Sequence, residues 1–444
     1  MLKTFNIGGI HPAENKISAE NAIKQLPLPG IVTILTNQHI GAPSKIVVEK
    51  GDYVKTGQLI AKYAGFVSAN IHSSVSGKVL KIEPVIDSTG YKREAVIIES
   101  DGLDIWDDSI DRSEELVTDS VFTANQIEDR ILSCGIVGMG GAAFPTHVKL
   151  LHPPGEKADL LLINGAECEP YLTADHRLML EKGEEILIGV KLLMKTLNVD
   201  KAIIGIENNK PDAINQLTEL SKKYNGISIC PLKVKYPQGG EKQLIKAVTG
   251  REVKSGKLPI STGVVVNNIS TAHAIYEAVT KNKPLFERII TVTGKSLKNP
   301  SNFKVRIGAS VSELIEAAGG LPTTTSKVII GGPMMGRSVG TIDIPVTKGT
   351  SGILILDDED SHRKKALNCI RCGRCVSACP MGLEPYLLMT LSEKVIFDKA
   401  EQNKIMDCVE CGSCSFVCPA NRPLLDYIRF GKAKVGNIIR NRKK

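Results

Sequence analysis

The chain has 444 residues, of which 42% are hydrophobic, so it is long enough for three or four domains with ordinary packed cores, and wholesale disorder is excluded. No stretch approaches the roughly 20 consecutive apolar residues that a membrane-spanning helix requires, and the first residues lack the apolar segment of a secretory signal. Residues 361–444 hold 16 Lys and Arg against 7 Asp and Glu, and aromatic residues make up only 4% of the chain, so we expect no nucleic-acid partner.

Residues 1–110 are predicted to form a small β-rich domain. From Gly41 onward, short β-type runs alternate with the glycine-containing turns KGD, KTGQ and VSGK, which is typical of a small barrel or sandwich. This stretch resembles the biotinyl- or lipoyl-type domain, which implies a barrel-sandwich fold. The hairpin in which a carrier domain presents its modified lysine reads YAGFVSANIH here and contains no Lys. We therefore expect a structural domain rather than a carrier.

Residues 111–283 are predicted to form a Rossmann-like α/β domain. A helix expected at Thr123–Leu132 leads into CGIVGMGGAAFPTHVKL, where three glycines let the backbone approach a flat or anionic ligand. Such a loop by itself is often only a turn. The apolar runs in ADLLLINGAECEP, KAIIGIENN and ISICPLKV, with the helical PDAINQLTELSKKY between the last two, favour a parallel sheet with ligands at the strand ends.

Four motifs of this domain resemble, in the same order, those of the flavin- and NADH-binding subunit of respiratory complex I: GMGGAAFPTHVK, NGAECEP, YPQGGEKQL and VVVNNISTA. The resemblance implies direct hydride transfer between NAD(H) and FMN, so no catalytic side chain is assigned. Two positions depart from the family pattern, because Ala166 replaces an Asp and Gly240 replaces a Glu. By this resemblance the nicotinamide nucleotide would contact Phe144, Glu169 and Glu241, and FMN would contact Gly138, Gly140, Gly141, Lys149, Asn164, Glu167, Tyr236, Gly239, Gly240, Asn267, Asn268 and Thr271.

Residues 284–360 are predicted to be a β-grasp domain with return strands. The stretch Pro284–Pro322 resembles the soluble-ligand-binding β-grasp domain that follows the flavin domain in complex I, and we expect a structural spacer. The motif GGPMMG (Gly331–Gly336) has no evident chemical role, although its two Met side chains could pack near the flavin or a cluster. The charged stretch Asp357–Lys365 is interpreted as a linker.

Residues 361–444 contain two cysteine runs with the same spacing, C-x2-C-x2-C-x3-C-P. This is the spacing of bacterial two-cluster ferredoxins, in which the fourth Cys of each run ligates the other [4Fe–4S] cluster, so an α-helical two-cluster domain is predicted. Zinc sites seldom use such a run, and disulfides are disfavoured in a chain without a secretory signal. Cys134, Cys168 and Cys230 share no ligand spacing and are expected to be buried free thiols. One cluster is assigned to Cys369, Cys372, Cys375 and Cys418, and the other to Cys408, Cys411, Cys414 and Cys379.

The order of the four domains, together with the opening GGIHPAENK, resembles that of the RnfC family, a component of the Rnf complex, over nearly the full length. The resemblance implies a peripheral subunit on the cytoplasmic side of the cell membrane, within a ferredoxin:NAD oxidoreductase that pumps Na⁺ or H⁺. Its partners would be the membrane subunits and, through the complex, ferredoxin. FMN would be noncovalent, because the covalent-flavin motif of other Rnf subunits is absent.

Two other interpretations remain open at this stage. The same architecture resembles a soluble corrinoid (cobalamin) reductase of diol-utilising microcompartments. Alternatively, the chain is a two-cluster relay with a vestigial flavin pocket, as Ala166 and Gly240 suggest. The positive charge of residues 361–444 either offsets the negative clusters or docks an acidic redox partner or an anionic membrane surface.

Overall fold

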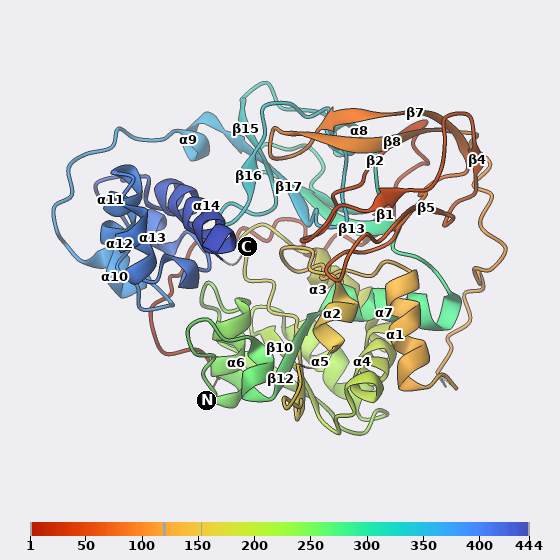
Figure 1. Ribbon diagram of the computed structural model, residues 1–444, viewed down its shortest axis with the longest axis horizontal. Helices are drawn as coiled ribbons and strands as arrows, with labels where there is room; N and C mark the ends of the chain where they lie inside the picture. Colours follow the sequence, from red (N-terminus) through yellow and green to blue (C-terminus); the bar gives the residue numbers. More distant parts are fainter. Residues whose placement is uncertain (1, 119–120, 152, 443–444) are drawn as a thin grey trace.

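The structure is a computed structural model that describes residues 2–118, 121–151 and 153–442. It has a mixed α/β fold with four parts (Figure 1). A β-rich domain and a mixed sheet lie on one side of a parallel α/β domain, and a helical domain lies beside them. No helix within these described ranges is long and apolar enough to cross a membrane.

The β-rich domain consists of two antiparallel sheets, with strand orders β2-β8-β7-β4 and β3-β5-β6. Alternate residues of each strand point into one core, so that Val32 is paired with Ile98 and Ile34 with Val96, and all four are buried. This arrangement agrees with the predicted barrel-sandwich. The strands are β2 (Ile31–Leu35), β3 (Lys45–Ile46), β4 (Tyr53–Val54), β5 (Leu59–Lys62), β6 (Ile71–His72), β7 (Gly77–Ile86) and β8 (Lys92–Ser100).

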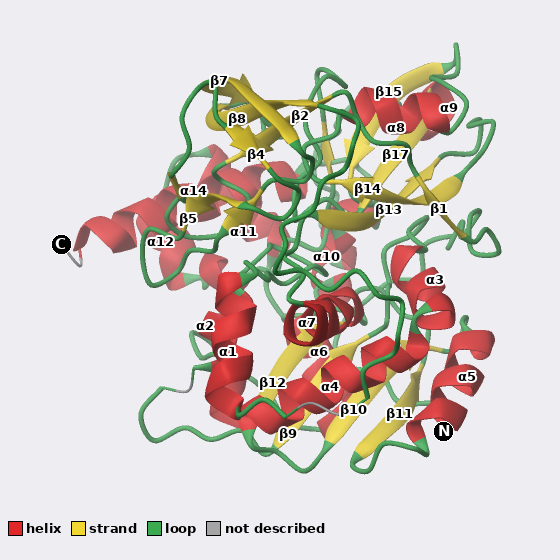
Figure 2. Ribbon diagram, turned by 90° about the vertical axis from the view of Figure 1, so that its right-hand side faces the viewer, coloured by secondary structure: helices red, strands yellow, loops and turns green. Residues whose placement is uncertain are grey.

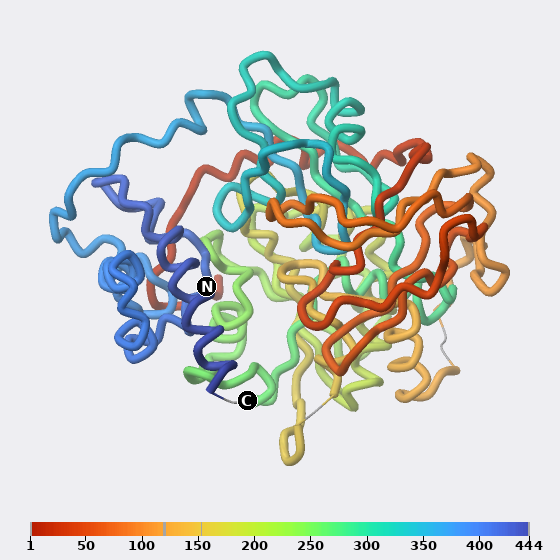
Figure 3. The backbone as a smooth tube through the Cα atoms, turned by 45° about the horizontal axis from the view of Figure 1, so that its top comes forward, coloured from red at the N-terminus to blue at the C-terminus, as the bar shows by residue number. Residues whose placement is uncertain are grey.

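The N-terminal segment, residues 2–25, contributes no strand to these two sheets and contacts other parts of the chain. Ile10 exchanges two backbone hydrogen bonds of 2.9 Å with Tyr236, and the amide of Gly9 donates to the carbonyl of Ala378 at 3.0 Å. Strand β1 (Ile23–Gln25) pairs in parallel with β14 (Ser301–Arg306). The segment therefore runs along the helical domain before it reaches the sheets (Figure 3).

The central domain contains a fully parallel sheet of order β11-β10-β9-β12, with helices on both faces (Figure 2). Leu161 and Ile163 pack on one side with α4 and α7, whereas Leu160 and Leu162 pack on the other side with α6. The helix predicted at Thr123–Leu132 is confirmed as α1, and Thr123 caps it with a reciprocal bond to Gln126. The elements are β9 (Leu160–Asn164), β10 (Ala202–Glu207), β11 (Ile227–Leu232), β12 (Val264–Asn268), α1 (Ala124–Ser133), α2 (Thr146–Leu150), α3 (Ala174–Glu181), α4 (Gly183–Leu197), α5 (Pro211–Ser221), α6 (Glu241–Thr249), η1 (Pro259–Thr262) and α7 (Ile269–Lys281).

The third part is a six-stranded mixed sheet of order β1-β14-β13-β17-β15-β16, with α8 packed against it. The stretch Asp357–Lys365, interpreted above as a linker, begins with the last residue of β17 and includes the short helix α9. The elements are β13 (Glu287–Thr293), β14 (Ser301–Arg306), α8 (Val311–Ala317), β15 (Thr325–Ile330), β16 (Arg337–Ser338), β17 (Gly352–Asp357) and α9 (Asp358–Ser361).

The helical domain is built around the long helix α14, which packs against α11. Each cysteine run forms a loop and then a short helix, and Gly373 (φ +73°) and Gly412 (φ +78°) supply the left-handed turn between the two. The elements are α10 (Arg374–Ala378), α11 (Pro385–Glu393), α12 (Phe397–Gln402), η2 (Ile405–Asp407), α13 (Ser413–Phe416) and α14 (Leu424–Arg442).

Candidate functional site: two thiol groups beside a glycine-rich cleft

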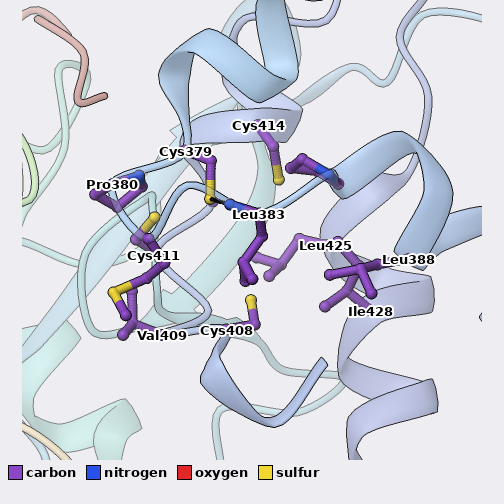
Figure 4. A pocket seen from close by; sticks show the side chains of 13 residues that line it. Cys379, Pro380, Leu383, Leu388, Cys408, Val409, Cys411, Cys414, Leu425 and Ile428 are labelled. Atoms are coloured by element: carbon purple, nitrogen blue, oxygen red, sulfur yellow. Dashed lines mark hydrogen bonds between the residues drawn. The ribbon is translucent and has the colours of Figure 1, made fainter. Parts of the chain in front are cut away.

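One group of thiols combines the two cysteine runs. Cys379, from the first run, lines the same cavity as Cys408, Cys411 and Cys414 from the second (Figure 4). The cavity includes about 360 Å³ of space that no protein atom fills, part of it open to solvent. The remaining lining is apolar and includes Leu383. This is the group of four that the ferredoxin spacing predicts.

The other four cysteines of the two runs lie closer to the surface. Cys375 is near Cys418, since its pKa is raised first by burial and also by the Cys418 thiol. Cys369 and Cys372 are exposed. The two groups therefore differ in burial, with three of the four thiols of the first group buried and none of the second.

The first group suits an iron–sulfur cluster on chemical grounds. Burial, with the adjacent thiols, raises the pKa of Cys414 to about 12 and that of Cys408 to about 11, so both sulfurs are neutral without a cation. Iron binds thiolates and would supply the positive charge that favours them. Backbone amides already point at two of the sulfurs, with Leu383 N 3.4 Å from the Sγ of Cys379 and Glu410 N 3.4 Å from the Sγ of Cys408.

The glycine-rich loop lies against the first turn of α7. The amide of Met139 donates to Oγ1 of Thr271 at 2.9 Å, and a Cβ on Gly140 would come within 2.6 Å of Nδ2 of Asn268. Only glycine permits this approach. A Cβ on Gly141 would instead meet no atom within 4 Å. The loop thus packs on one side and is open on the other.

Several polar side chains lie near the carboxyl ends of β9 and β12. Asn164 donates to the carbonyl of Gly239 at 2.9 Å, and Lys149 bonds Glu241 at 3.1 Å and the carbonyl of Val266 at 3.2 Å. The Nδ2 atom of Asn267 is buried without a partner among the described atoms. These groups fit a phosphate-bearing flavin, because the Lys149 ammonium supplies positive charge, Asn267 an unpaired donor and the glycine-rich loop an uncovered backbone.

Three residues assigned above to the flavin or the nucleotide point elsewhere. The carboxylate of Glu167 accepts the amides of Asp175 (2.7 Å) and His176 (3.2 Å) at the start of α3. Glu169 accepts the amides of two residues in the Gly331–Gly336 loop. Tyr236 donates to the carbonyl of Cys411 at 2.8 Å. Burial raises the pKa of Glu169 to about 7.

Two further assigned positions, Phe144 and Gly240, lie in close backbone contacts of this region. The carbonyl of Phe144 accepts the amide of Gly138 at 2.8 Å, which closes the glycine-rich loop. Gly240 precedes α6, and a Cβ there would meet the Gln243 side chain at 2.5 Å. Ala166, the other departure from the family pattern, is buried, and its carbonyl accepts from Lys210 at 2.8 Å.

Lys16 is a residue of this region that the sequence reasoning missed. Its ammonium donates to the carbonyls of three residues in the turn after β9, namely Glu167 (2.7 Å), Glu169 (3.0 Å) and Leu172 (2.7 Å). Burial lowers its pKa to about 8. Lys16 is the last residue of the motif GGIHPAENK, which contributes to the family resemblance, but nothing in that motif predicts this contact. Lys16 also lines a second cavity, together with Cys168 and Glu207.

All three isolated cysteines are free thiols, but two of them differ from the prediction in burial. Cys134 is buried, as expected, but Cys168 and Cys230 are half-buried, so the prediction is wrong for those two. The Sγ atom of Cys168 accepts the amide of Gly239 at 3.2 Å. Cys168 therefore helps to hold the glycine turn before α6.

Comparison with known families accounts for most of the chain. Residues 3–103 match the RnfC barrel sandwich hybrid domain, residues 131–277 the Nuo51 FMN-binding domain, residues 289–338 the SLBB domain, and residues 368–422 a 4Fe-4S dicluster domain. The chain is 48% identical over 438 residues to the RnfC protein of the proton-translocating ferredoxin:NAD(+) oxidoreductase complex of Clostridium ljungdahlii, covering 98% of this chain and 94% of that protein. The chain belongs to the RnfC family.

A second relative also places the chain in the RnfC family. The corresponding protein of the Na(+)-translocating ferredoxin:NAD(+) oxidoreductase complex of Acetobacterium woodii is 47% identical over 429 residues, with 96% of each chain covered. Membership of the RnfC family confirms the resemblance inferred from the sequence. Among solved structures, a chain of an NAD+-reducing [NiFe]-hydrogenase in the air-oxidised state has a TM-score of 0.51 at 17% identity, covering 70% of this chain and 66% of that one. That similarity shows a shared fold alone.

Proposed function

We propose that this chain is the electron-input subunit of a membrane-bound, ion-translocating ferredoxin:NAD oxidoreductase. The relatives' names and the FMN-binding and dicluster domains support this function. The observation that carries it is the contact between the flavin-type domain and the cysteine runs. The hydroxyl of Tyr236, which follows β11, donates to the carbonyl of Cys411 at 2.8 Å. The proposed flavin and cluster sites would therefore be adjacent within one chain.

The glycine-rich cleft would hold noncovalent FMN and the nicotinamide nucleotide. Gly140 and Gly141 would present their backbone to the phosphate, and Lys149 would offset its charge. The partnerless Nδ2 of Asn267 would donate to the flavin. Bound FMN would exchange a hydride with NAD(H) and pass electrons one at a time. The residues of the chain bind and orient, and none is required as an acid or base.

The two thiol groups would hold the two clusters in a fixed order. The group of Cys379, Cys408, Cys411 and Cys414 contains the residue that Tyr236 contacts, so it would be the nearer cluster. The group that contains the exposed Cys369 and Cys372 would be the outer cluster. Electrons would then leave the chain at its surface.

The surface around the outer group suits a protein partner. Leu367 and Ile370 are 57% and 67% exposed, and Arg371 and Arg374 beside them are basic. Exposed apolar side chains within a positive surface favour an acidic redox partner. We assign this face to the other subunits of the complex, which would hold the chain at the cytoplasmic side of the membrane.

An anaerobic NADH titration of the reconstituted protein tests this function. We expect the flavin absorbance to bleach first and the cluster absorbance to follow, as electrons leave the flavin. Lys149→Met should weaken FMN binding, while Lys157→Met, which changes a lysine outside the assigned site, should not. Failure of NADH to bleach bound flavin in the unchanged protein would contradict the proposal. Turnover with cobalamin as acceptor and no association with membrane subunits would favour the corrinoid reductase instead.

A further inference from the structure

The Gly331–Gly336 loop, GGPMMG, lies between the flavin-type domain and the cysteine runs. It connects β15 to β16, and Ile330 of β15 is paired with Arg337 of β16 across the hairpin. The amide of Gly331 donates to the carbonyl of Gly352 at 2.7 Å, and the amide of Gly336 donates to that of Gly332 at 2.9 Å. The loop is thus a closed hairpin end attached to the six-stranded sheet.

One side of the loop is bound to the turn after β9. The carboxylate of Glu169 accepts the amides of Met334 (3.1 Å) and Met335 (2.8 Å). A Cβ on Gly332 would come within 2.3 Å of Oε2 of Glu169, so this approach requires glycine. The same carboxylate lies 3.4 Å from the hydroxyl of Tyr236. The loop is therefore tied to the flavin-type domain through one carboxylate.

The other side of the loop rests on the second cysteine run. A Cβ on Gly412 would come within 2.8 Å of the carbonyl oxygen of Met334. Arg429 donates to the carbonyl of Met335 at 3.0 Å and to the carboxylate of Glu410 at 3.2 Å. Met334 packs with Cys411 and Cys168 in one apolar cluster. The loop is therefore also tied to the segment that carries Cys408 and Cys411.

These contacts join three segments that are far apart in sequence. We infer that the Gly331–Gly336 loop is a positioning element that holds the Cys408–Cys411 segment against the Glu169 turn, and so sets the distance between the flavin and the nearer cluster. This inference rests on the proposed function. It gives the GGPMMG motif a role, and it explains why the Glu169 carboxylate faces the loop rather than open solvent.

The inference is tested with variants that release the loop without altering either redox site. Arg429→Gln removes the tie on the cluster side, and Gly332→Ala pushes the loop away from Glu169. Arg442→Gln is the matched control, because it lies on the same helix and pairs only with Asp398 and Glu401 among its described contacts. Each reconstituted protein is mixed rapidly with NADH, and the flavin and cluster absorbances are followed separately.

Both variants should bind FMN, be reduced by NADH at the flavin and show the cluster EPR signals of the unchanged protein. Cluster reduction should be about tenfold slower or more, because about 1 Å of misplacement is costly to a reaction between fixed centres. Amide hydrogen exchange of residues 331–336 and 408–412 should rise in both variants. The Arg442→Gln control should change none of these.

Two results separate the failure of this inference from the failure of the proposed function. If exchange at residues 331–336 rises but the clusters are reduced as fast as in the unchanged protein, the loop does not set the distance. The same conclusion follows if exchange does not rise, because the loop then does not depend on these ties. If NADH cannot reduce the flavin of the unchanged protein, the proposed function fails, whatever the variants do.

Discussion

Exchange of the fourth cysteine between the two runs can be tested with pairs of substitutions. Cys379 lies in the first run but lines the cavity of Cys408, Cys411 and Cys414, whereas Cys375 lies near Cys418. Cys379→Ser combined with Cys408→Ser therefore changes two ligands of one cluster. Cys379→Ser combined with Cys375→Ser changes one ligand of each. Single substitutions cannot make this distinction, because each damages one cluster in either arrangement.

The expected difference follows from one four-iron cluster per group of thiols. The Cys379→Ser and Cys408→Ser pair should keep about four of about eight irons per chain, and the Cys379→Ser and Cys375→Ser pair should keep almost none. Iron and acid-labile sulfide are measured after anaerobic reconstitution, with the EPR spectrum of the reduced protein. Cys230→Ser, outside both groups, should keep all the iron. The reverse order of the two pairs would refute the exchange and return each run to its own cluster.

Two further predictions concern stability. In Gly189→Ala the new Cβ would lie 2.0 Å from the carbonyl oxygen of Ala272, so overpacking between α4 and α7 should outweigh the gain in helix propensity and lower the free energy of unfolding by about 1–2 kcal/mol. Gly436→Ala, whose Cβ would meet nothing nearer than 3.7 Å, is the control in urea unfolding, and equal midpoints would contradict this packing. Burial lowers the pKa of Lys348 to about 7, so the unfolded chain binds more protons above that pH and stability should rise towards pH 9. In the unchanged protein the free energy of unfolding should rise by about 1–2 kcal/mol between pH 7 and pH 9, and in Lys348→Met this rise should be absent. If the two proteins differ in stability by the same amount at both pH values, the prediction is contradicted.

The fold was predictable from the sequence where the signal is local. The strands and helices of the central domain follow from apolar runs and caps such as Thr123, because alternation and capping act over a few residues. The cysteine spacing likewise predicts that the first three thiols of each run lie close together, since only two residues separate neighbouring cysteines, and the ferredoxin pattern assigns the fourth thiol to the other run. The N-terminal segment was not predictable, because its amides are satisfied by the distant Tyr236 and Ala378.

The sequence by itself determined the family, the four-domain order, and the residue types that can hold FMN and two clusters. Only the tertiary structure decided where some of those residues point. The motifs predict that Glu169 contacts the nucleotide and that Tyr236 contacts the flavin. In the structure the carboxylate of Glu169 accepts from the Gly331–Gly336 loop, and the hydroxyl of Tyr236 donates to the carbonyl of Cys411. A motif records a residue type at a position in the chain, whereas the partner of a polar atom depends on which distant segment packs against it. The role of GGPMMG could therefore be inferred only once the turn after β9 and the second cysteine run lay on either side of it.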